Sequence, residues 1–399
     1  MNQADSLPTT DAAATGWGGS PFTLSQVAAA MLIGTVGVTI AGIQPILYGA
    51  LLEAGRINMA QIGQAATLEL LALGIGVVLG GALMKGARMR PMVVLAALLL
   101  AAANLATLRV SGDMVPLVRG LAGLPGGAMV WVMTATIVRS ARPATLAAAS
   151  LLTQALVQSS VAATVAFLAH GAVGGVPIAI SLLSLVAIAV TPLLPRAFAP
   201  LPREPTVSGL PPLRGWAVLA ATLLLQAAIV GAWVYMEPVG RQAGLTDAQI
   251  AFATPASLAS QIVGGTIAIL LSSRVRWFPA LILAASGLVL LMLGMSRMPA
   301  PTMFIAMEMG FGALWTFSSP FLTPFSIEND PTRRTAMLGP SAMLIGSGLG
   351  PIVASALAAG GDGVLVLRMS ALFAVGTMLL ITGLFLTRRK MGGARISHA

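Results

Sequence analysis

Apolar stretches of about 20 residues or more follow one another from Leu24 to Thr387, with short polar connections between them. A helix of about 20 apolar residues spans the ~30 Å hydrocarbon core of a bilayer. The pattern predicts an all-α integral membrane protein with twelve transmembrane helices, because unpaired backbone groups in lipid cost several kcal/mol each. The expected spans are 25–49, 59–84, 91–110, 115–137, 144–169, 173–194, 216–238, 248–272, 278–297, 302–325, 335–358 and 364–387.

The longest polar connection covers residues 195–215 and contains six prolines. It shows no helical periodicity, so we expect an extended cytoplasmic linker there. The linker divides the chain into two bundles of six helices, over 24–194 and 216–388. Residues 1–23 and 389–399 are expected to be cytosolic tails, the first of them disordered.

The two halves of the chain repeat each other. Ala60-Gln61-Ile62 opens the second span, and Ala248-Gln249-Ile250 opens the eighth. The same offset relates Gly76 to Gly264, Arg88 to Arg276 and Pro91 to Pro279. A parallel repeat of two six-span units, related by an axis along the membrane normal, is a transporter architecture.

Composition and charge agree with a membrane protein. The chain is 57% hydrophobic and 9% charged, whereas soluble domains carry about 25% charged residues. Sixteen of the 22 Lys and Arg residues lie at one alternating set of connections and at the C-terminus, and five lie at the other set. Basic residues accumulate on the cytoplasmic side, so we expect both termini to be cytoplasmic and the protein to lie in a bacterial inner membrane. The net charge of +10 is thus an orientation signal, and no basic segment is interleaved with aromatics as a nucleic-acid site requires.

Enzyme chemistry has little support in the sequence. The absence of cysteine excludes disulfides and thiolate chemistry. The two histidines, His170 and His398, form no metal motif, and there is no nucleophile elbow or nucleotide-binding loop. We therefore expect no enzyme activity, no metal, no cofactor and no ATP-driven pumping by this chain.

The loop after the second span carries a recognisable motif. It reads GALMKGARMRP over 81–91 and is similar to the G-x-L-x-D-R-x-G-R-R/K loop of the major facilitator superfamily. Lys85 stands where the family has its acidic residue. The residues assigned to this cytoplasmic loop motif are Gly81, Leu83, Arg88 and Arg90.

The fourth span strengthens the resemblance, which covers residues 24–388. RGLAGLPGGA resembles the family pattern R-x-x-x-G-x-G, with Arg119 and Gly123 in register. The resemblance implies two pseudo-symmetric six-helix bundles around a central cavity, and a part in proton handling for Arg119. The G-x-x-x-G-P pattern of family antiporters is missing from 151–165. The direction of transport therefore stays open.

Ionisable residues inside spans are costly and are functional hypotheses by default. Glu69 is about 13 Å into the second span at 1.5 Å per residue, near the midplane, where a carboxyl group could bind and release a proton. Alternatively it is a protonated residue that packs one helix on another. Arg119 needs a partner, which could be Glu69, an anionic substrate or the carbonyls near Pro125. Glu308 lies at intermediate depth and suits either coupling or structural pairing.

Glu237 lies at the outer end of the seventh span, where a helix-end side chain reaches water. As an alternative, it forms part of an outer gate together with Tyr235.

Polar and aromatic side chains within the spans are the candidates for lining a cavity. The glutamines could line it or join helices, and Gln44 beside Pro45 is the best cavity candidate. Aromatic walls suit an organic substrate, although the same residues could face lipid or pack. The candidates are Gln44, Gln154, Gln158, Gln226 and Gln261, together with Trp131, Trp315 and Phe317.

The sequence thus predicts a secondary active transporter that moves a small amphipathic organic solute by alternating access. Protons would drive it through Glu69 with the help of Arg119. Its expected partners are the solute, protons and membrane lipid, and we expect a monomer. The alternatives are an uncoupled facilitator and a non-transporting receptor or scaffold, which should carry a sizeable soluble domain.

Overall fold

The computed structural model describes residues 22–84, 86–168, 172–198, 210–272 and 274–396. Most of the expected N-terminal tail, the middle of the expected linker and residues 397–399 lie outside this part of the chain. The described residues form helices α1 (Leu24–Glu53), α2 (Met59–Leu83), α3 (Met89–Thr107), α4 (Met114–Val138), α5 (Pro143–Leu168), α6 (Gly175–Val190), α7 (Leu213–Trp233), α8 (Met236–Gln242), α9 (Asp247–Leu271), α10 (Trp277–Met295), α11 (Pro301–Asn329), α12 (Arg334–Ala358) and α13 (Gly363–Ile396), with 3-10 turns η3 (Gly86–Arg88) and η4 (Thr191–Leu193).

Eleven of the described helices are long and apolar enough to cross a membrane. The 29-residue helix α11 is also long enough to cross a membrane. It is not among these eleven helices, because Glu308 and several Ser and Thr residues make it less apolar. It packs against α9 and α10 and so belongs to the same bundle as these two helices. The seven-residue α8 lies between α7 and α9 and is too short to span.

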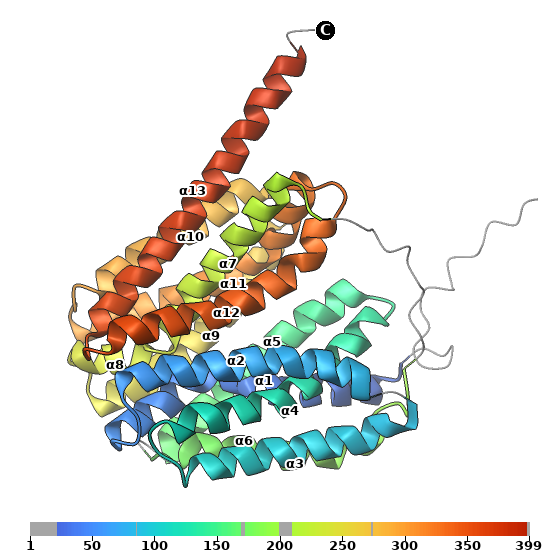
Figure 1. Ribbon diagram of the computed structural model, residues 1–399, viewed down its shortest axis with the longest axis vertical. Coiled ribbons are helices and arrows are strands. Elements are labelled where there is room, and N and C mark those ends of the chain that lie inside the picture. Colours follow the sequence, from blue (N-terminus) through green and yellow to red (C-terminus); the bar gives the residue numbers. More distant parts are fainter. Residues whose placement is uncertain (1–21, 85, 169–171, 199–209, 273, 397–399) are drawn as a thin grey trace, which may run out of the picture.

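Helices α1–α6 form one bundle and α7–α13 form a second (Figure 1). Packing repeats between them: α2 packs on α4 as α9 packs on α11, and α3 packs on α6 as α10 packs on α13. The halves meet along α2 with α12 and along α5 with α9. In the first of these seams, the Thr67 hydroxyl donates to the Gly348 carbonyl at 2.8 Å.

We call the two ends of the molecule the α8 end and the linker end. The α8 end is where α1 ends, α2 begins and α8 lies, and the linker end is where α1 begins and α13 ends. In Figure 1 the two bundles lie against each other at the α8 end and diverge towards the linker end.

Equivalent capping residues begin α2 and α9. Asn58 accepts from the Gln61 backbone N–H, and the Gln61 side chain accepts from the Asn58 N–H. Thr246 and Gln249 make the same reciprocal pair at the start of α9. Such a capping box satisfies N–H groups that the first turn leaves free, so the repeated sequence around Ala60 and Ala248 fixes two equivalent helix starts.

Two glycines bring the backbones of α2 and α4 together. A Cβ atom at Gly123 would overlap the Glu69 carbonyl oxygen, and one at Gly127 would overlap the Leu73 carbonyl oxygen. In the second half, a Cβ atom at Gly312 of α11 would likewise overlap the Ser257 carbonyl oxygen of α9. Small residues allow this close approach of membrane helices.

The expected spans and the observed helices differ mainly at two places. The span expected over 216–238 is interrupted: α7 ends at Trp233 and α8 begins at Met236. Pro238 falls in the first turn of α8, where a missing N–H removes no helical hydrogen bond. At the other end of the chain, α13 continues to Ile396, beyond the span expected over 364–387.

Candidate functional site

A fully buried ion pair joins Glu69 of α2 to Arg119 of α4. Glu69 is the eleventh of the 25 residues of α2, so it lies near the middle of its helix. Its Oε1 accepts from the Arg119 guanidinium, and its Oε2 accepts from the Tyr48 hydroxyl at 2.9 Å and from Gln44 Nε2 at 3.2 Å. Three donors from α1 and α4 therefore converge on one carboxylate.

The other side of the Arg119 guanidinium is held by α3. Its Nη1 donates to Asn104 Oδ1 at 3.0 Å and to the Thr107 hydroxyl at 3.2 Å. Asn104 and Thr107 are oriented in turn by hydrogen bonds to the carbonyls of Leu100 and Ala103. Three partners were considered for Arg119, and the structure shows Glu69 as its ionic partner. Helices α1, α2, α3 and α4 all contribute side chains to the hydrogen-bond network around this ion pair.

The network limits what Glu69 can do without rearrangement. A carboxylate that accepts only donor groups is satisfied as the anion. To take up a proton it must separate from Arg119, and a buried charge left without its partner costs about 3–5 kcal/mol. Proton uptake at Glu69 therefore requires a new partner for Arg119, such as an anionic group or water.

The second half places a carboxyl group at the position that corresponds to Arg119. Counting 189 residues on from Arg119 of α4 gives Glu308 of α11. This step also relates Gly123 to Gly312, which make equivalent backbone contacts. The second half thus has an acid, Glu308, where the first half has Arg119.

Glu237 and Glu308 are both buried. Glu308 is 2% exposed, and its Oε1 has no hydrogen-bond partner among the described residues. Glu237 is 7% exposed, although a helix-end residue was expected to reach water. The expectation was wrong because the chain breaks after Trp233, and α8 places Glu237 against Gly49 of α1, where an added Cβ would overlap its carboxyl group.

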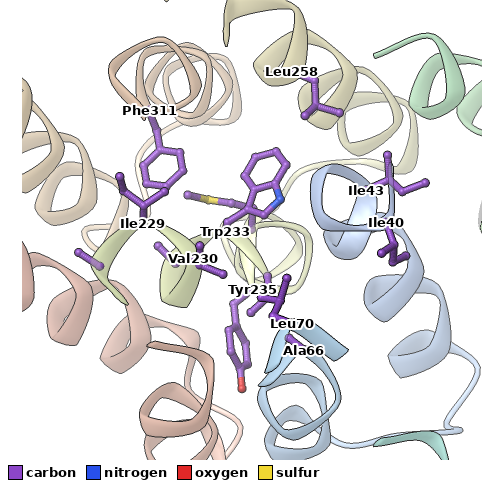
Figure 2. Close-up of a cluster of buried hydrophobic side chains, with 14 of the residues drawn as sticks. Ile40, Ile43, Ala66, Leu70, Ile229, Val230, Trp233, Tyr235, Leu258 and Phe311 are labelled. Carbon is purple, nitrogen blue, oxygen red and sulfur yellow. The ribbon is translucent and has the colours of Figure 1, made fainter. Parts of the chain in front are cut away.

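Aromatic rings fill the space between α7 and α11. The Trp233 ring stacks on Phe311 with centroids 6.4 Å apart, and the Trp315 ring meets Trp233 edge-on at 5.7 Å. Figure 2 shows Trp233 pointing between Phe311 and Leu258. Phe317, in contrast, packs against Phe321 of its own helix at 5.4 Å. Trp315 is therefore part of a wall shared by two helices, whereas Phe317 is not.

The chain between α7 and α8 bonds the second half to the first. Trp233 Nε1 donates to the Ala41 carbonyl at 3.2 Å. The Tyr235 hydroxyl donates to the Met59 carbonyl and accepts from the Gly63 N–H, each at 3.0 Å. Figure 2 shows Tyr235 extending alongside the start of α2. These contacts bond the two halves together at the α8 end.

Arg241 of α8 adds an ionic contact at the same end. Its Nη1 lies 2.5 Å from Glu53 of α1 and 2.6 Å from Asp247 of α9, and its Nη2 lies 3.4 Å from Glu237. Arg241 is partly exposed. One arginine is thus shared among three carboxylates, of which Glu53 belongs to the first half.

The five glutamines considered for a cavity fall into two groups. Gln44 and Gln158 join helices: Gln44 bonds Glu69, and Gln158 Nε2 donates to a carbonyl of α1 at 3.3 Å. Gln226 and Gln261 are buried and Gln154 is half-buried. The Gln261 Nε2 is buried and has no hydrogen-bond partner among the described residues, so it has hydrogen bonds left to donate.

Trp131 and the loop motif lie at the linker end. The Trp131 ring lies against Gly81 and meets Phe198 edge-on at 5.6 Å, so it is separate from the aromatic wall of α11. Arg90 Nε donates to the Leu194 carbonyl at 3.0 Å and ties α3 to the end of η4. The remaining motif residues, Leu83 and Arg88, are exposed.

Several residues of these networks were not singled out from the sequence. Tyr48 follows Gln44 by four residues, so both lie on one face of α1, and that spacing was an available signal. The chain has two tyrosines, and both donate to buried groups. The contacts of Trp233 with Ala41 and of Arg241 with Glu53 cross between the halves, so the local sequence does not indicate them.

Comparison with solved structures supports the same architecture. The nucleoside transporter NupG, in a mutant form, matches with a TM-score of 0.73 and 13% identity, over 90% of this chain and 99% of that one. A bacterial homologue of the human lysosomal transporter Spinster, inward-facing and unoccupied, matches with a TM-score of 0.60 and 13% identity, over 91% and 96%. No family model and no curated protein sequence matches. Together, the two six-helix bundles and these structural neighbours show that the chain has the major facilitator superfamily fold.

Proposed function

We propose that the protein is a secondary active transporter that moves a small amphipathic organic solute across the bacterial inner membrane by alternating access. The observation that carries this proposal is the arrangement of the two pseudo-symmetric bundles, which are bonded together at the α8 end and diverge at the linker end. Two bundles that rock about a site between them can expose it to each side of the membrane in turn.

The distribution of basic residues supports a cytoplasmic location for the linker end. Both termini are then cytoplasmic, and the bundles diverge on the cytoplasmic side. The α8 end, with Tyr235 and Arg241, is the outer gate in its closed state. The transporter works as a monomer, since each chain carries both bundles.

The residues between the bundles suit a solute with an apolar ring and a few polar groups. Trp315 offers an aromatic face, and the buried Gln261 Nε2, which has no partner among the described residues, offers a donor once the bundles move apart. An aromatic face and a small number of placed polar groups are typical of small-molecule sites. Nucleosides have this chemistry and are among the first compounds to test, because a structural neighbour is described as a nucleoside transporter.

A thermal-shift screen of the purified protein tests the solute class. A ligand that binds the folded state raises the apparent melting temperature by mass action. We expect a stabilising compound among uncharged, ring-containing metabolites, and a Gln261→Ala variant should lose the shift. A shift only with sugars or multiply charged ions would contradict the proposed class.

Proton coupling is assigned to Glu69 with Arg119 as its counter-charge. Glu69→Gln has nearly the same size as the protonated residue, so we expect it to bind solute and to exchange labelled for unlabelled solute. It should lose accumulation driven by a pH gradient, because it has no proton to release. The measurement is uptake into proteoliposomes with and without an imposed gradient.

The control for this experiment is Glu328→Gln, near the linker end and outside the Glu69 network. Uptake driven by the gradient at the parent level in Glu69→Gln would remove Glu69 from coupling. If the protein is an uncoupled facilitator, the pH gradient should change solute uptake neither in the parent protein nor in Glu69→Gln. If it is a receptor or scaffold, neither protein should exchange labelled for unlabelled solute.

A further inference from the structure

A groove runs between α7 and α13 at the linker end of the second bundle. It has a volume of about 360 Å³, and its lining includes Leu213, Arg214 and Ala217 of α7 and Leu380, Gly383 and Leu384 of α13. Two of its rim residues, Leu213 and Leu379, are 86% and 69% exposed, so the groove opens to the surroundings of the bundle. It is separate from the buried ion pair and the aromatic wall, and the proposed transport does not use it.

The groove is polar at one end and apolar along the rest. The apolar spans of α7 and α13 begin at Leu213 and end at Thr387, and both of these residues lie at the linker end. There the Arg214 Nη2 donates to the Thr387 hydroxyl at 3.1 Å and bridges the two helices. The apolar part extends from Thr387 back to Leu379, which is about 12 Å of helix at 1.5 Å per residue. An amphipathic molecule with a polar head and an aliphatic chain matches this shape.

Gly383 keeps the middle of the groove empty. Nothing lies within 4 Å of the position of a Cβ atom at this residue. The glycines at Gly123 and Gly127 differ from it, because they allow neighbouring helix backbones to touch. Glycine disfavours a helix interior relative to alanine, and no close contact within the protein accounts for it at Gly383. The missing side chain leaves space for an acyl chain of the surrounding membrane.

Positive charge gathers at the polar end of the groove. Arg214 is half-buried and, among the described residues, it pairs with no acidic group. Arg388, Arg389 and Lys390 directly follow Thr387, and Figure 1 shows α13 continuing beyond the start of α7. The sequence after Asp362 contains no acidic residue. Basic residues just beyond an apolar span attract anionic lipid headgroups, so the charge at this end complements a phosphate group.

We propose that this groove binds an anionic phospholipid, with one acyl chain beside Gly383 and the phosphate at Arg214 and Thr387. A zwitterionic headgroup fits less well, because its ammonium group would lie among basic residues. The bound lipid joins α13 to the start of α7, and the other end of α7 bonds the first half through Trp233. The inference goes beyond the proposed function, since it depends neither on the solute nor on proton coupling.

Titration of lipid into the purified protein in detergent tests the proposal. The melting temperature is measured with increasing dioleoylphosphatidylglycerol, which is anionic, and with dioleoylphosphatidylcholine, which is zwitterionic and has the same acyl chains. A ligand that binds the folded state raises the apparent melting temperature by mass action. Inorganic phosphate forms a third series, because it supplies the charge without the chain. Native mass spectrometry of the same samples counts the lipid molecules that stay bound.

We expect phosphatidylglycerol to stabilise the parent protein more than phosphatidylcholine does. Gly383→Leu should lose this difference because its side chain fills the groove, whereas Gly383→Ala should keep most of it. Arg214→Gln should weaken the apparent affinity for phosphatidylglycerol about fivefold. Arg274→Gln is the matched control, at an exposed position of the same bundle end that does not line the groove. None of these positions is buried, so the variants should fold, and melting curves without lipid verify this.

Equal stabilisation by the two lipids would overturn the inference, and so would an undiminished response to phosphatidylglycerol in the Gly383→Leu, Arg214→Gln double variant. A shift with inorganic phosphate as large as that with phosphatidylglycerol would also overturn it, since the acyl chain would then contribute nothing. These measurements use neither solute nor pH gradient. If the lipid binds as expected while no solute is moved, the groove is a lipid site and the proposed transport fails. If solute is moved and the lipid series do not differ, the transport proposal stands and this inference fails.

Discussion

At the scale of single residues, two buried glutamates have opposite surroundings. Glu69 accepts from Arg119, Tyr48 and Gln44, whereas Glu308 Oε1 has no partner among the described residues. We expect Glu69→Gln to lower the melting temperature, since a hydrogen bond to a charged group contributes about 1.5–3 kcal/mol and Arg119 would lose its counter-charge. Glu308→Gln should leave the melting temperature unchanged or raise it.

Thermal unfolding of the purified variants in one detergent compares these two substitutions directly. Arg88→Gln, at an exposed position, is the control for loss of a charge. If the melting temperature fell by a similar amount in Glu69→Gln and Glu308→Gln, Glu308 would have a partner that stabilises its anion.

At the scale of helices, the close approach of α2 and α4 makes a sharper prediction. We expect Gly127→Ala to destabilise the protein by about 1–3 kcal/mol or more, because its Cβ would overlap the Leu73 carbonyl and force the helices apart. Gly339→Ala in α12 is the matched control: nothing lies within 4 Å of its Cβ position, and alanine favours a helix over glycine by up to about 1 kcal/mol. Melting temperatures that fall equally in both variants would refute the packing argument.

At the scale of the whole molecule, orientation in the membrane is the first property to test. A reporter fused after Ala399 should report a cytoplasmic location, and one inserted between Gly360 and Gly361 should report the opposite side. The expectation follows from the uneven distribution of basic residues, and an enzyme reporter active on only one side of the membrane measures it. Reversed readings would make the linker end extracytoplasmic and the observed state outward-facing.

The elements of the fold were predictable to different degrees. Helix positions followed from apolar length, because lipid leaves a segment of that length few other structures. Glu69 and Arg119 stood out as charges within spans, but their link to α3 through Asn104 and Thr107 required the packing of the helices. The break after Trp233 was missed, because Trp233 and Tyr235 bond a half of the chain that is distant in sequence.

The carbonyl contacts at Gly123, Gly127 and Gly312 also bear on how such a chain diverges over evolutionary time. They fix the distance between helices through backbone atoms, so most neighbouring side chains are free to be exchanged for other apolar ones. Side chains such as Val78 and Leu121, which are largely exposed on these helices, meet lipid tails that do not distinguish one aliphatic group from another. Two chains can then share this architecture with very little sequence likeness, as this chain and the NupG structure do at 13% identity over 90% of the chain.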